Sequence, residues 1–201
     1  TKTTINSSIL NTSTTNADHE EEINVGGATA DDTEVDLVKD LCEHEILHEE
    51  NVFSSFIPLI HHIIDKNASY PVDLVVVACL ALSKLMLLSS SFCSKNLQIL
   101  FTLIKKSEHE NIRLNAVILI GDIIQRFPNL IEPWMPNMFS TLRDDSVQVR
   151  KAVLAVLSSL ILNDMVKVKG HISELVLCIE DPDPVISART RLFFHELSRK
   201  V

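Results

Sequence analysis

The chain has 201 residues, of which 46% are hydrophobic and 5% aromatic, so it is long enough and apolar enough to bury the core of one domain. Only 4 residues are glycine, and two of these are adjacent, which favours helices and disfavours a turn-rich β architecture. The formal net charge of −9 belongs to the first 50 residues, which carry 13 acidic and 2 basic side chains, so the nearly neutral remainder is not excluded from binding nucleic acid.

Residues 1–24 are rich in Thr, Ser and Asn and contain one isolated apolar pair. Such a segment cannot bury enough surface to offset the entropy lost on ordering, so we predict a disordered acidic linker. It also lacks the apolar core of a signal peptide. The folded part is expected to span residues 25–201. Because the first residue is Thr1 and not Met, we expect the chain to be a fragment of a longer protein.

The first predicted helix begins at Asp31 or Asp32, where Glu34 completes the spacing of a capping box. Apolar residues at helical spacing are expected to give it a buried face made of Val35, Val38, Leu41 and Cys42. A second helix is predicted over residues 53–65, with an inward face made of Phe56, Ile57, Ile60, Ile63 and Ile64.

Further helices are marked by prolines. Pro71 starts a helix that is expected to run to about Ser89, within the most apolar stretch of the chain. We interpret this stretch as a buried core helix and not as a membrane span, because Lys84 lies in its middle. Helices over residues 95–106, 111–126 and 129–143 follow, and later turns lie at Asp145, Gly170 and residues 181–184. We therefore expect nine helices in all, arranged as one lead-in helix followed by four hairpins of two helices each.

One helix face recurs at a fixed spacing. It consists of Val149, Val153, Val156, Leu157 and Leu160. A step of 37 residues forward gives Ile186, Thr190, Phe193, Phe194 and Leu197, and a step back gives Ile112, Ala116, Leu119, Ile120 and Ile123. A second step back gives a poorer match at Val75, Cys79, Leu82, Ser83 and Met86. This period is close to the ~40–47 residues of HEAT and armadillo repeats. The sequence therefore predicts an all-α HEAT-repeat solenoid of stacked antiparallel helix hairpins.

Several motifs in a fixed order resemble one family. They are GGATADDTE at residues 26–34, GDIIQRFPNLIEPW at 121–134, LRDDSVQVRK at 142–151, LILNDMVKVKGHISELVLCIEDPDP at 160–184 and LFFHELSRK at 192–200. In this order they resemble the C-terminal HEAT region of the condensin subunit 1 family, the non-SMC regulatory subunits of condensin I. The resemblance covers about residues 24–200.

The resemblance implies a regulatory, non-catalytic scaffold in mitotic chromosome condensation. It implies binding to the kleisin subunit, to the SMC ATPase heads and to chromosomal DNA or chromatin, with histones among the candidate partners. It also implies a location in the nucleus and on mitotic chromosomes, with a cytoplasmic pool, and neither a membrane nor a small-molecule substrate. The alternative is an adaptor or transport scaffold that grips peptides. An importin-like groove would need regularly spaced Trp, and the single Trp134 cannot provide it, whereas an adaptin-like scaffold stays open.

No motif favours catalysis, a metal or a cofactor. The run HEILH at residues 44–48 matches the HExxH zinc pattern, but a third ligand is missing, because the extended pattern would require Gly and His where the chain has Asn51 and Ser54. The four cysteines show no CxxC spacing and are expected to be reduced thiols in or near the core. We therefore predict a protein that is not an enzyme.

The last 59 residues hold nine cationic side chains. Stacked hairpins place equivalent turns along one edge, so part of this set is expected to contact phosphates or an acidic partner: Arg150, Lys151, Lys167, Lys169, Arg189 and Arg191. Eight acidic residues share the region, so ordinary surface pairing is expected for most of these cations.

Three members of this set have distinct expectations. Arg150 occupies a repeat position that pairs with an aspartate of the neighbouring repeat, and Arg113 holds the equivalent position, but Ser187 does not. Lys167 and Lys169 lie in the VKVK turn, where no acidic residue is nearer in sequence than Asp164 and Glu174, so this turn is the better candidate for contact with a partner.

Overall fold

The computed structural model describes residues 30–48, 50–167 and 170–200, so the predicted linker over residues 1–24 lies outside the described part. The described residues form ten α-helices and no strand, which confirms the all-α class. The helices are α1 (Ala30–Asp40), α2 (Val52–Asp65), α3 (Val72–Met86), α4 (Ser90–Lys106), α5 (Glu110–Arg126), α6 (Pro128–Ile131), α7 (Met135–Ser140), α8 (Val147–Leu162), α9 (Ile172–Leu177) and α10 (Pro184–Lys200).

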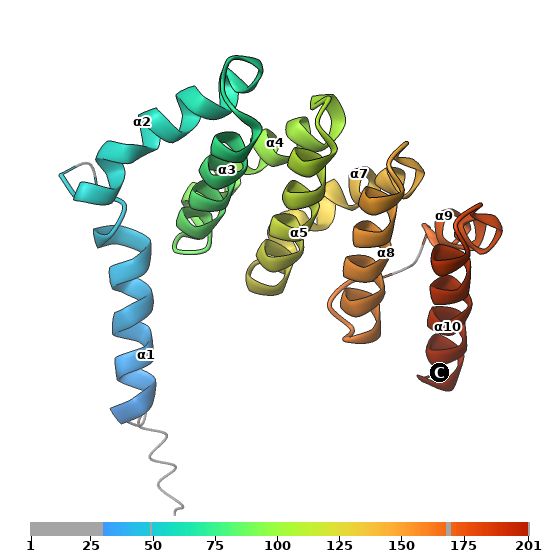
Figure 1. Ribbon diagram of the computed structural model, residues 1–201. Helices are drawn as coiled ribbons and strands as arrows, with labels where there is room; N and C mark the ends of the chain where they lie inside the picture. Colours follow the sequence, from blue (N-terminus) through green and yellow to red (C-terminus); the bar gives the residue numbers. More distant parts are fainter. Residues whose placement is uncertain (1–29, 49, 168–169, 201) are drawn as a thin grey trace, which may run out of the picture.

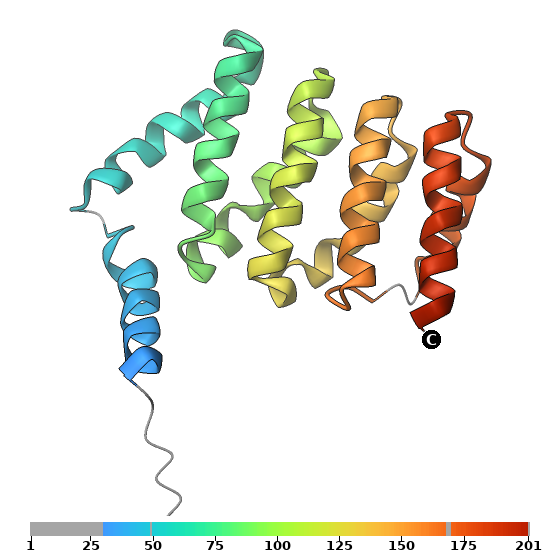
Figure 2. The same cartoon turned by 60° about the horizontal axis from the view of Figure 1, so that its bottom comes forward.

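Four long helices lie side by side in chain order. These are α3, α5, α8 and α10, which we call the row helices, and each packs against the next (Figures 1 and 2). Helices α4, α7 and α9 lie behind them in a second layer. Helix α2 packs against α3 at the start of the row, and α1 projects away from it (Figure 1).

The core lies between the two layers, and the row helices supply its repeated part. The sets of five residues predicted from the 37-residue spacing are buried or half-buried in all four row helices. In α5 and α3 every member of the set is buried. The poorer match of α3 at Cys79 and Ser83 is accommodated because the Ser83 hydroxyl donates a hydrogen bond to the Leu80 carbonyl at 2.9 Å.

The predicted buried face of the first helix is wrong, and that of the second is confirmed in part, since Ile63 and Ile64 are buried and Phe56 is not. Val35 and Val38 are each 52% exposed, Leu41 is 43% exposed and Phe56 is 53% exposed. Among the described residues, the main packing contact of α1 is with the π-helical turn that follows it, Leu41–Glu45. An amphipathic pattern marks the side of a helix that can be buried, and burial requires a second element to cover it.

Several predicted boundaries are also wrong. The apolar stretch contains a helix break, since α3 ends at Met86 and α4 begins at Ser90, five residues before its predicted start. Ser89 caps α4, because its hydroxyl accepts a hydrogen bond from the Phe92 N–H at 3.3 Å. The segment 129–143 is divided into α6, α7 and two 3₁₀ turns, Glu132–Trp134 and Thr141–Arg143. Within the described ranges, no helix is long and apolar enough to cross a membrane.

Candidate interaction surface

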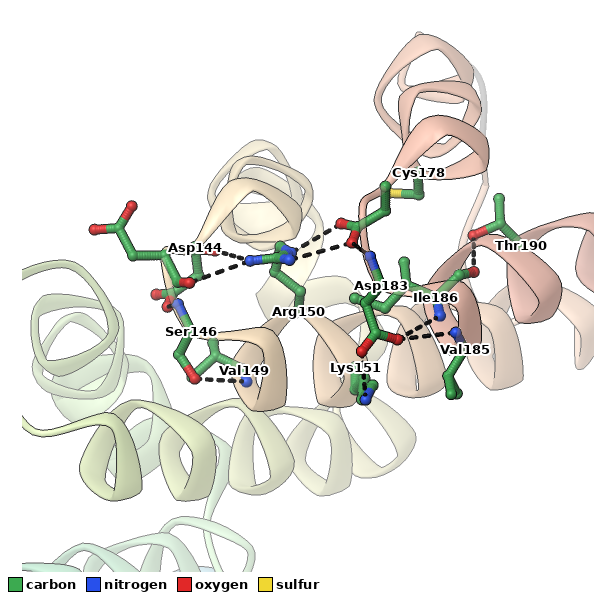
Figure 3. A network of polar contacts seen from close by, with 12 residues as sticks. Asp144, Ser146, Val149, Arg150, Lys151, Cys178, Asp183, Val185, Ile186 and Thr190 are labelled. Atoms are coloured by element: carbon green, nitrogen blue, oxygen red, sulfur yellow. Dashed lines mark hydrogen bonds and ion pairs between the residues drawn. The ribbon is translucent and has the colours of Figure 1, made fainter.

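Arg150 is held inside the molecule by an aspartate of the next helix pair. It lies in the first turn of α8, and its Nε and Nη2 donate to the two carboxylate oxygens of Asp181 at 2.9 and 3.1 Å. Its Nη1 donates to the carbonyls of Asp144 and Asp145 at 2.9 and 3.2 Å (Figure 3). The Arg150 and Asp181 side chains are only 12% and 9% exposed. The predicted pairing is confirmed, and contact of Arg150 with a partner stays a prediction.

The same arrangement occurs one helix pair earlier. Arg113 in α5 donates through Nε and Nη2 to Asp144, both at 2.9 Å, and through Nη1 to the carbonyls of Ser107 and Glu108 at 3.0 and 3.2 Å. Every residue of this set stands 37 positions before its counterpart around Arg150. We call the two ion pairs, Arg113–Asp144 and Arg150–Asp181, the arginine–aspartate ladder.

Each ladder carboxylate also fixes the turn that leads into a row helix. Asp144 accepts from the Ser146 N–H, and Asp181 accepts from the Asp183 N–H, both at 2.8 Å. These Asx turns place the start of α8 and α10 against the arginine of the preceding row helix. The ladder therefore ties the start of α8 to α5 and the start of α10 to α8.

The electrostatics of the ladder follow from its hydrogen bonds. The bond to Asp144 raises the pKa of Arg113, and the bond to Asp181 raises the pKa of Arg150. Burial raises the pKa of Asp181, but hydrogen bonds from Arg150 and from the Asp183 N–H outweigh it and leave the pKa below its ordinary value. Both partners of the Arg150–Asp181 pair are therefore charged at neutral pH.

Lys151 is also engaged within the chain. Its Nζ lies 2.9 Å from Asp183, and the two side chains are 25% and 18% exposed (Figure 3). Asp183 caps α10 as well, because it accepts from the backbone N–H groups of Val185 and Ile186 at 2.9 and 3.1 Å. The hydrogen bond from Lys151 lowers the pKa of Asp183. Lys151 thus stabilises the start of α10, and its contact with a partner stays a prediction.

Three of the predicted contact residues remain accessible. Lys167, Arg189 and Arg191 are exposed and form no ion pair with another described residue, whereas Lys169 lies outside the described residues. Successive helix residues are turned by about 100°, so Arg189 and Arg191 project from opposite sides of α10. These two arginines of α10 therefore do not lie on one common ridge.

Lys167 lines a hollow of about 540 Å³. The hollow lies between the loop after α8 and the proline-marked segment of α6 and α7, and its walls include Pro133, Pro136, Met165 and His171. His171 itself stacks on Phe139 with 4.4 Å between ring centroids. The lining is mainly apolar, which suits a protein side chain better than a phosphate.

Two further cations that were counted in the sequence are paired. Arg143 lies 2.6 Å from Glu174, and the Lys200 ammonium donates to the Asp164 carboxylate and to the Leu162 carbonyl. Asp164 has a φ of +58°, the left-handed conformation that ends α8, so a non-glycine residue holds this position while its carboxylate binds α10. The sequence analysis did not name the ladder aspartates, although their separation of 37 residues was the signal that could have identified them. Nothing in the sequence pattern indicated the Asp164–Lys200 contact.

Several side chains elsewhere that could bind a metal or act as nucleophiles are paired or buried. His44 lies in the π-helical turn, and its Nδ1 lies 3.0 Å from the Asp40 carboxylate. Burial raises the pKa of Cys79 and of Cys93 to about 11, so both are neutral thiols at pH 7. In the part of the chain that the structure describes, no three His, Cys, Asp or Glu side chains are grouped as a metal site requires.

Comparison with known proteins identifies the family of this chain. Residues 111–201 match the family described as non-SMC mitotic condensation complex subunit 1. Condensin complex subunit 1 of Xenopus laevis is 48% identical over 182 residues, which is 90% of this chain and 13% of that protein. The chain belongs to the condensin complex subunit 1 family. This assignment favours the condensin expectation over an adaptin-like adaptor.

Other members of the condensin complex subunit 1 family match over a similar extent. The human protein is 43% identical over 182 residues, 90% of this chain and 13% of that protein, and the Saccharomyces cerevisiae protein is 34% identical over 194 residues, 96% of this chain and 16% of that protein. The chain therefore spans only 13% to 16% of the length of these relatives. Both rungs of the ladder lie within the family match.

Proposed function

We propose that this chain is part of a regulatory, non-catalytic subunit of condensin, and that its row is a segment of a HEAT-repeat solenoid within residues 25–201. The 37-residue register, the two-layer packing and the repeated ladder support the solenoid. The family match supports the condensin assignment. Action in the nucleus and on mitotic chromosomes, with a cytoplasmic pool and with residues 1–24 as a tether, belongs to the same proposal.

The observation that carries the proposed mode of action is the exposed side of the row helices. Ile118 and Leu192 occupy equivalent positions 74 residues apart, and they are 45% and 59% exposed. Ala155 lies midway between them in sequence and is also exposed. This repeated position places an exposed, uncharged side chain on each of three consecutive row helices, and we call these three positions the stripe. Such side chains suit contact with a protein partner better than contact with a phosphate backbone.

We therefore assign this stripe to a protein partner within condensin, the kleisin subunit first and the SMC ATPase heads second. The expected test is binding of kleisin fragments to wild-type chain and to Ile118→Asp and Leu192→Asp variants. Each variant should weaken binding at least about tenfold, as loss of an interface side chain of this size does. Ser94→Asp on the second layer is the matched control and should bind as wild type. Equal affinities in all four proteins would refute the stripe as the docking site.

A second proposal, contact with chromosomal DNA or chromatin, depends on the accessible cations Lys167, Arg189 and Arg191. The predicted contact at Lys169 belongs to this proposal too. Reversal of two phosphate-contacting charges should reduce the slope of log affinity against log salt by about 1.8.

The test is a salt titration of duplex DNA binding. Two double variants are measured, one with Lys167→Glu and Lys169→Glu and one with Arg189→Glu and Arg191→Glu. The matched control is a third double variant, Lys105→Glu and Lys106→Glu, at the end of α4. Unchanged slopes in both test variants would assign the segment to protein docking alone. Histone binding is tested in the same variants with reconstituted nucleosomes.

A further inference from the structure

The hollow of about 540 Å³ beside Lys167 follows a break in the second layer of helices. The second-layer helix between α3 and α5 is α4, which is continuous over 17 residues. The segment between α5 and α8 is divided instead, because Pro133 and Pro136 have no N–H to donate to a helical hydrogen bond and each begins a new turn. The hollow lies along this divided segment.

The base of the hollow belongs to the apolar core. Ile124 of α5 and Met135 of α7 line it and are 1% and 7% exposed. Met165 and Val166, in the loop after α8, are half-buried, since they pack against the core and also line the hollow. An apolar side chain placed here would bury its own surface together with the surface that these two residues still expose to water.

One lysine and two acidic side chains line the same hollow. The Asp164 carboxylate is already held by the Lys200 ammonium. Glu132 and Lys167 are both exposed, and neither forms an ion pair with another residue in the part of the chain that the structure describes. They line one hollow without bridging it, so both charges are available to an occupant.

A second unpaired cation lies beside the hollow. Arg126, in the last turn of α5, is two residues from Ile124 and two from Pro128, which both line the hollow. It is exposed, and its guanidinium lies 5.5 Å from the centre of the Phe127 ring. Among the described residues, no acidic side chain pairs with it. The free charges at the hollow are therefore two cations and one carboxylate, which favour an acidic occupant.

The combination of an apolar base and free cations matches a peptide better than a nucleic acid. A phosphate backbone binds through its charges and would leave the apolar base uncovered. A peptide can place a carboxylate near Lys167 and an apolar side chain against Met165 and Val166 at the same time. The volume also lies within the range of about 300–1,000 Å³ that is usual for binding pockets.

We propose that this hollow is a docking site for a short peptide segment of a partner protein, one that carries acidic residues next to an apolar side chain. Lys167 and Arg126 attract its carboxylates, and Pro136, Met165 and Val166 receive its apolar side chain. None of the stripe residues lines the hollow, so this site goes beyond the proposed contact with kleisin. It competes with DNA for Lys167, and the variants below separate the two.

The test is selection from a phage-displayed library of random peptides on the whole chain, followed by affinity measurements on the enriched peptides. These should combine acidic with apolar residues. Lys167→Glu should weaken their binding at least about tenfold, and Pro136→Asn, which makes one wall polar without adding a charge, at least about fivefold. Glu132→Gln should strengthen binding, because it removes the free carboxylate. The matched control is Lys95→Glu, a charge reversal at an exposed position of α4, which should bind as wild type.

Several outcomes would overturn the site. These are a selection without enriched sequences, enriched peptides that bind Lys167→Glu as tightly as wild type, and a loss in Lys167→Glu with none in Pro136→Asn, which would indicate a contact through charge alone.

The substituted residues are exposed, so the changes do not empty the core. If Pro136→Asn nevertheless lowers the helical circular dichroism, Glu132→Gln decides, because loss of the fold cannot raise the affinity. The selection uses no condensin subunit, so its failure would leave the proposed function untouched.

Discussion

Substitution of Arg150 by methionine would remove one rung of the ladder while keeping the unbranched apolar stem. The variant leaves Asp181 with 9% of its side chain exposed, without a counter-ion and with one remaining hydrogen bond, from the Asp183 N–H. It also frees the carbonyls of Asp144 and Asp145, which Arg150 holds at 2.9 and 3.2 Å. Four hydrogen bonds are lost in one substitution.

The expected loss of unfolding free energy is about 2–3 kcal/mol. Removing one partner of a fully buried ion pair costs about 3–5 kcal/mol, and an exposed pair contributes at most about 1 kcal/mol. The Arg150–Asp181 pair lies between these limits, because it borders a shallow surface hollow that water can enter. Arg150→Lys should lose about 1–2 kcal/mol, since an ammonium cannot reproduce the two-point contact.

The assay is urea unfolding followed by helical circular dichroism, with Arg143→Met as the matched control. Arg143 is 63% exposed and pairs with Glu174, so its loss should cost less than about 1 kcal/mol. In a double-mutant cycle, Arg150→Met with Asp181→Asn should lose less than the sum of the single variants by at least about 1 kcal/mol. Additive losses, or a loss in Arg150→Met no larger than in Arg143→Met, would refute the ladder as a stabilising contact.

The pH dependence gives an independent check. The folded pKa of Asp181 is lower than its unfolded value of about 3.8, so between the two values the unfolded chain binds more protons and stability rises with pH. The contribution of the pair is therefore complete above pH 4 and is lost as the pH falls through the folded pKa. The stability difference between wild type and Arg150→Met should be constant from pH 7 to about pH 5 and should not grow on acidification. A difference that increases toward pH 3 would contradict this assignment.

Three further predictions concern packing and the end of α8. Gly121→Ala should lower the unfolding free energy by about 1 kcal/mol, because overpacking against Val156 outweighs the gain in helix propensity. In urea unfolding, the double variant Gly121→Ala, Val156→Ala should lose less free energy than the sum of the losses of the two single variants. Asp164→Ala should destabilise the chain more than Asp164→Gly in thermal unfolding, since both lose the Lys200 contact but only glycine tolerates the φ of +58° without strain. Thiol titration of the native chain at pH 7 should leave Cys79 and Cys93 unreacted, because burial raises the pKa of each to about 11. Unfolding in urea should expose both thiols together. Prompt reaction of either in the native chain would show that α3 and α4 pack less tightly than described.

The periodic part of the fold was predictable from the sequence. The faces of α5, α8 and α10 followed from a 37-residue spacing, because consecutive helix pairs repeat the same packing problem. The end of α5 followed from Pro128, which cannot continue a helix. The break at Ser89 was missed, since hydropathy averages over a serine whose effect is a single capping hydrogen bond.

The candidate site was predictable only where the repeat constrained it. The Arg150 pairing recurs at Arg113, so periodicity indicated it. The Lys151–Asp183 contact joins residues 32 apart that a neighbouring repeat does not duplicate, because Leu114 stands at the equivalent place in α5. Exposure of Phe56 could not be derived either, since the pattern of one helix does not reveal which elements surround it.

How this segment can act depends on which of its cationic side chains are paired within the chain and which are accessible. Nine cationic side chains in the last 59 residues suggested a basic ridge, yet the ladder and the caps of the row helices engage Arg150 and Lys151. Lys167, Arg189 and Arg191 are the members of the predicted set that the described residues leave accessible. Three phosphate contacts correspond to a slope of only about −2.7 in log affinity against log salt. A segment with so few contacts adds to DNA binding that other parts of an assembly begin, whereas an exposed, uncharged side chain recurs at the stripe position of three row helices. Protein docking is therefore the stronger of the two proposed roles, and the kleisin experiment discriminates between them.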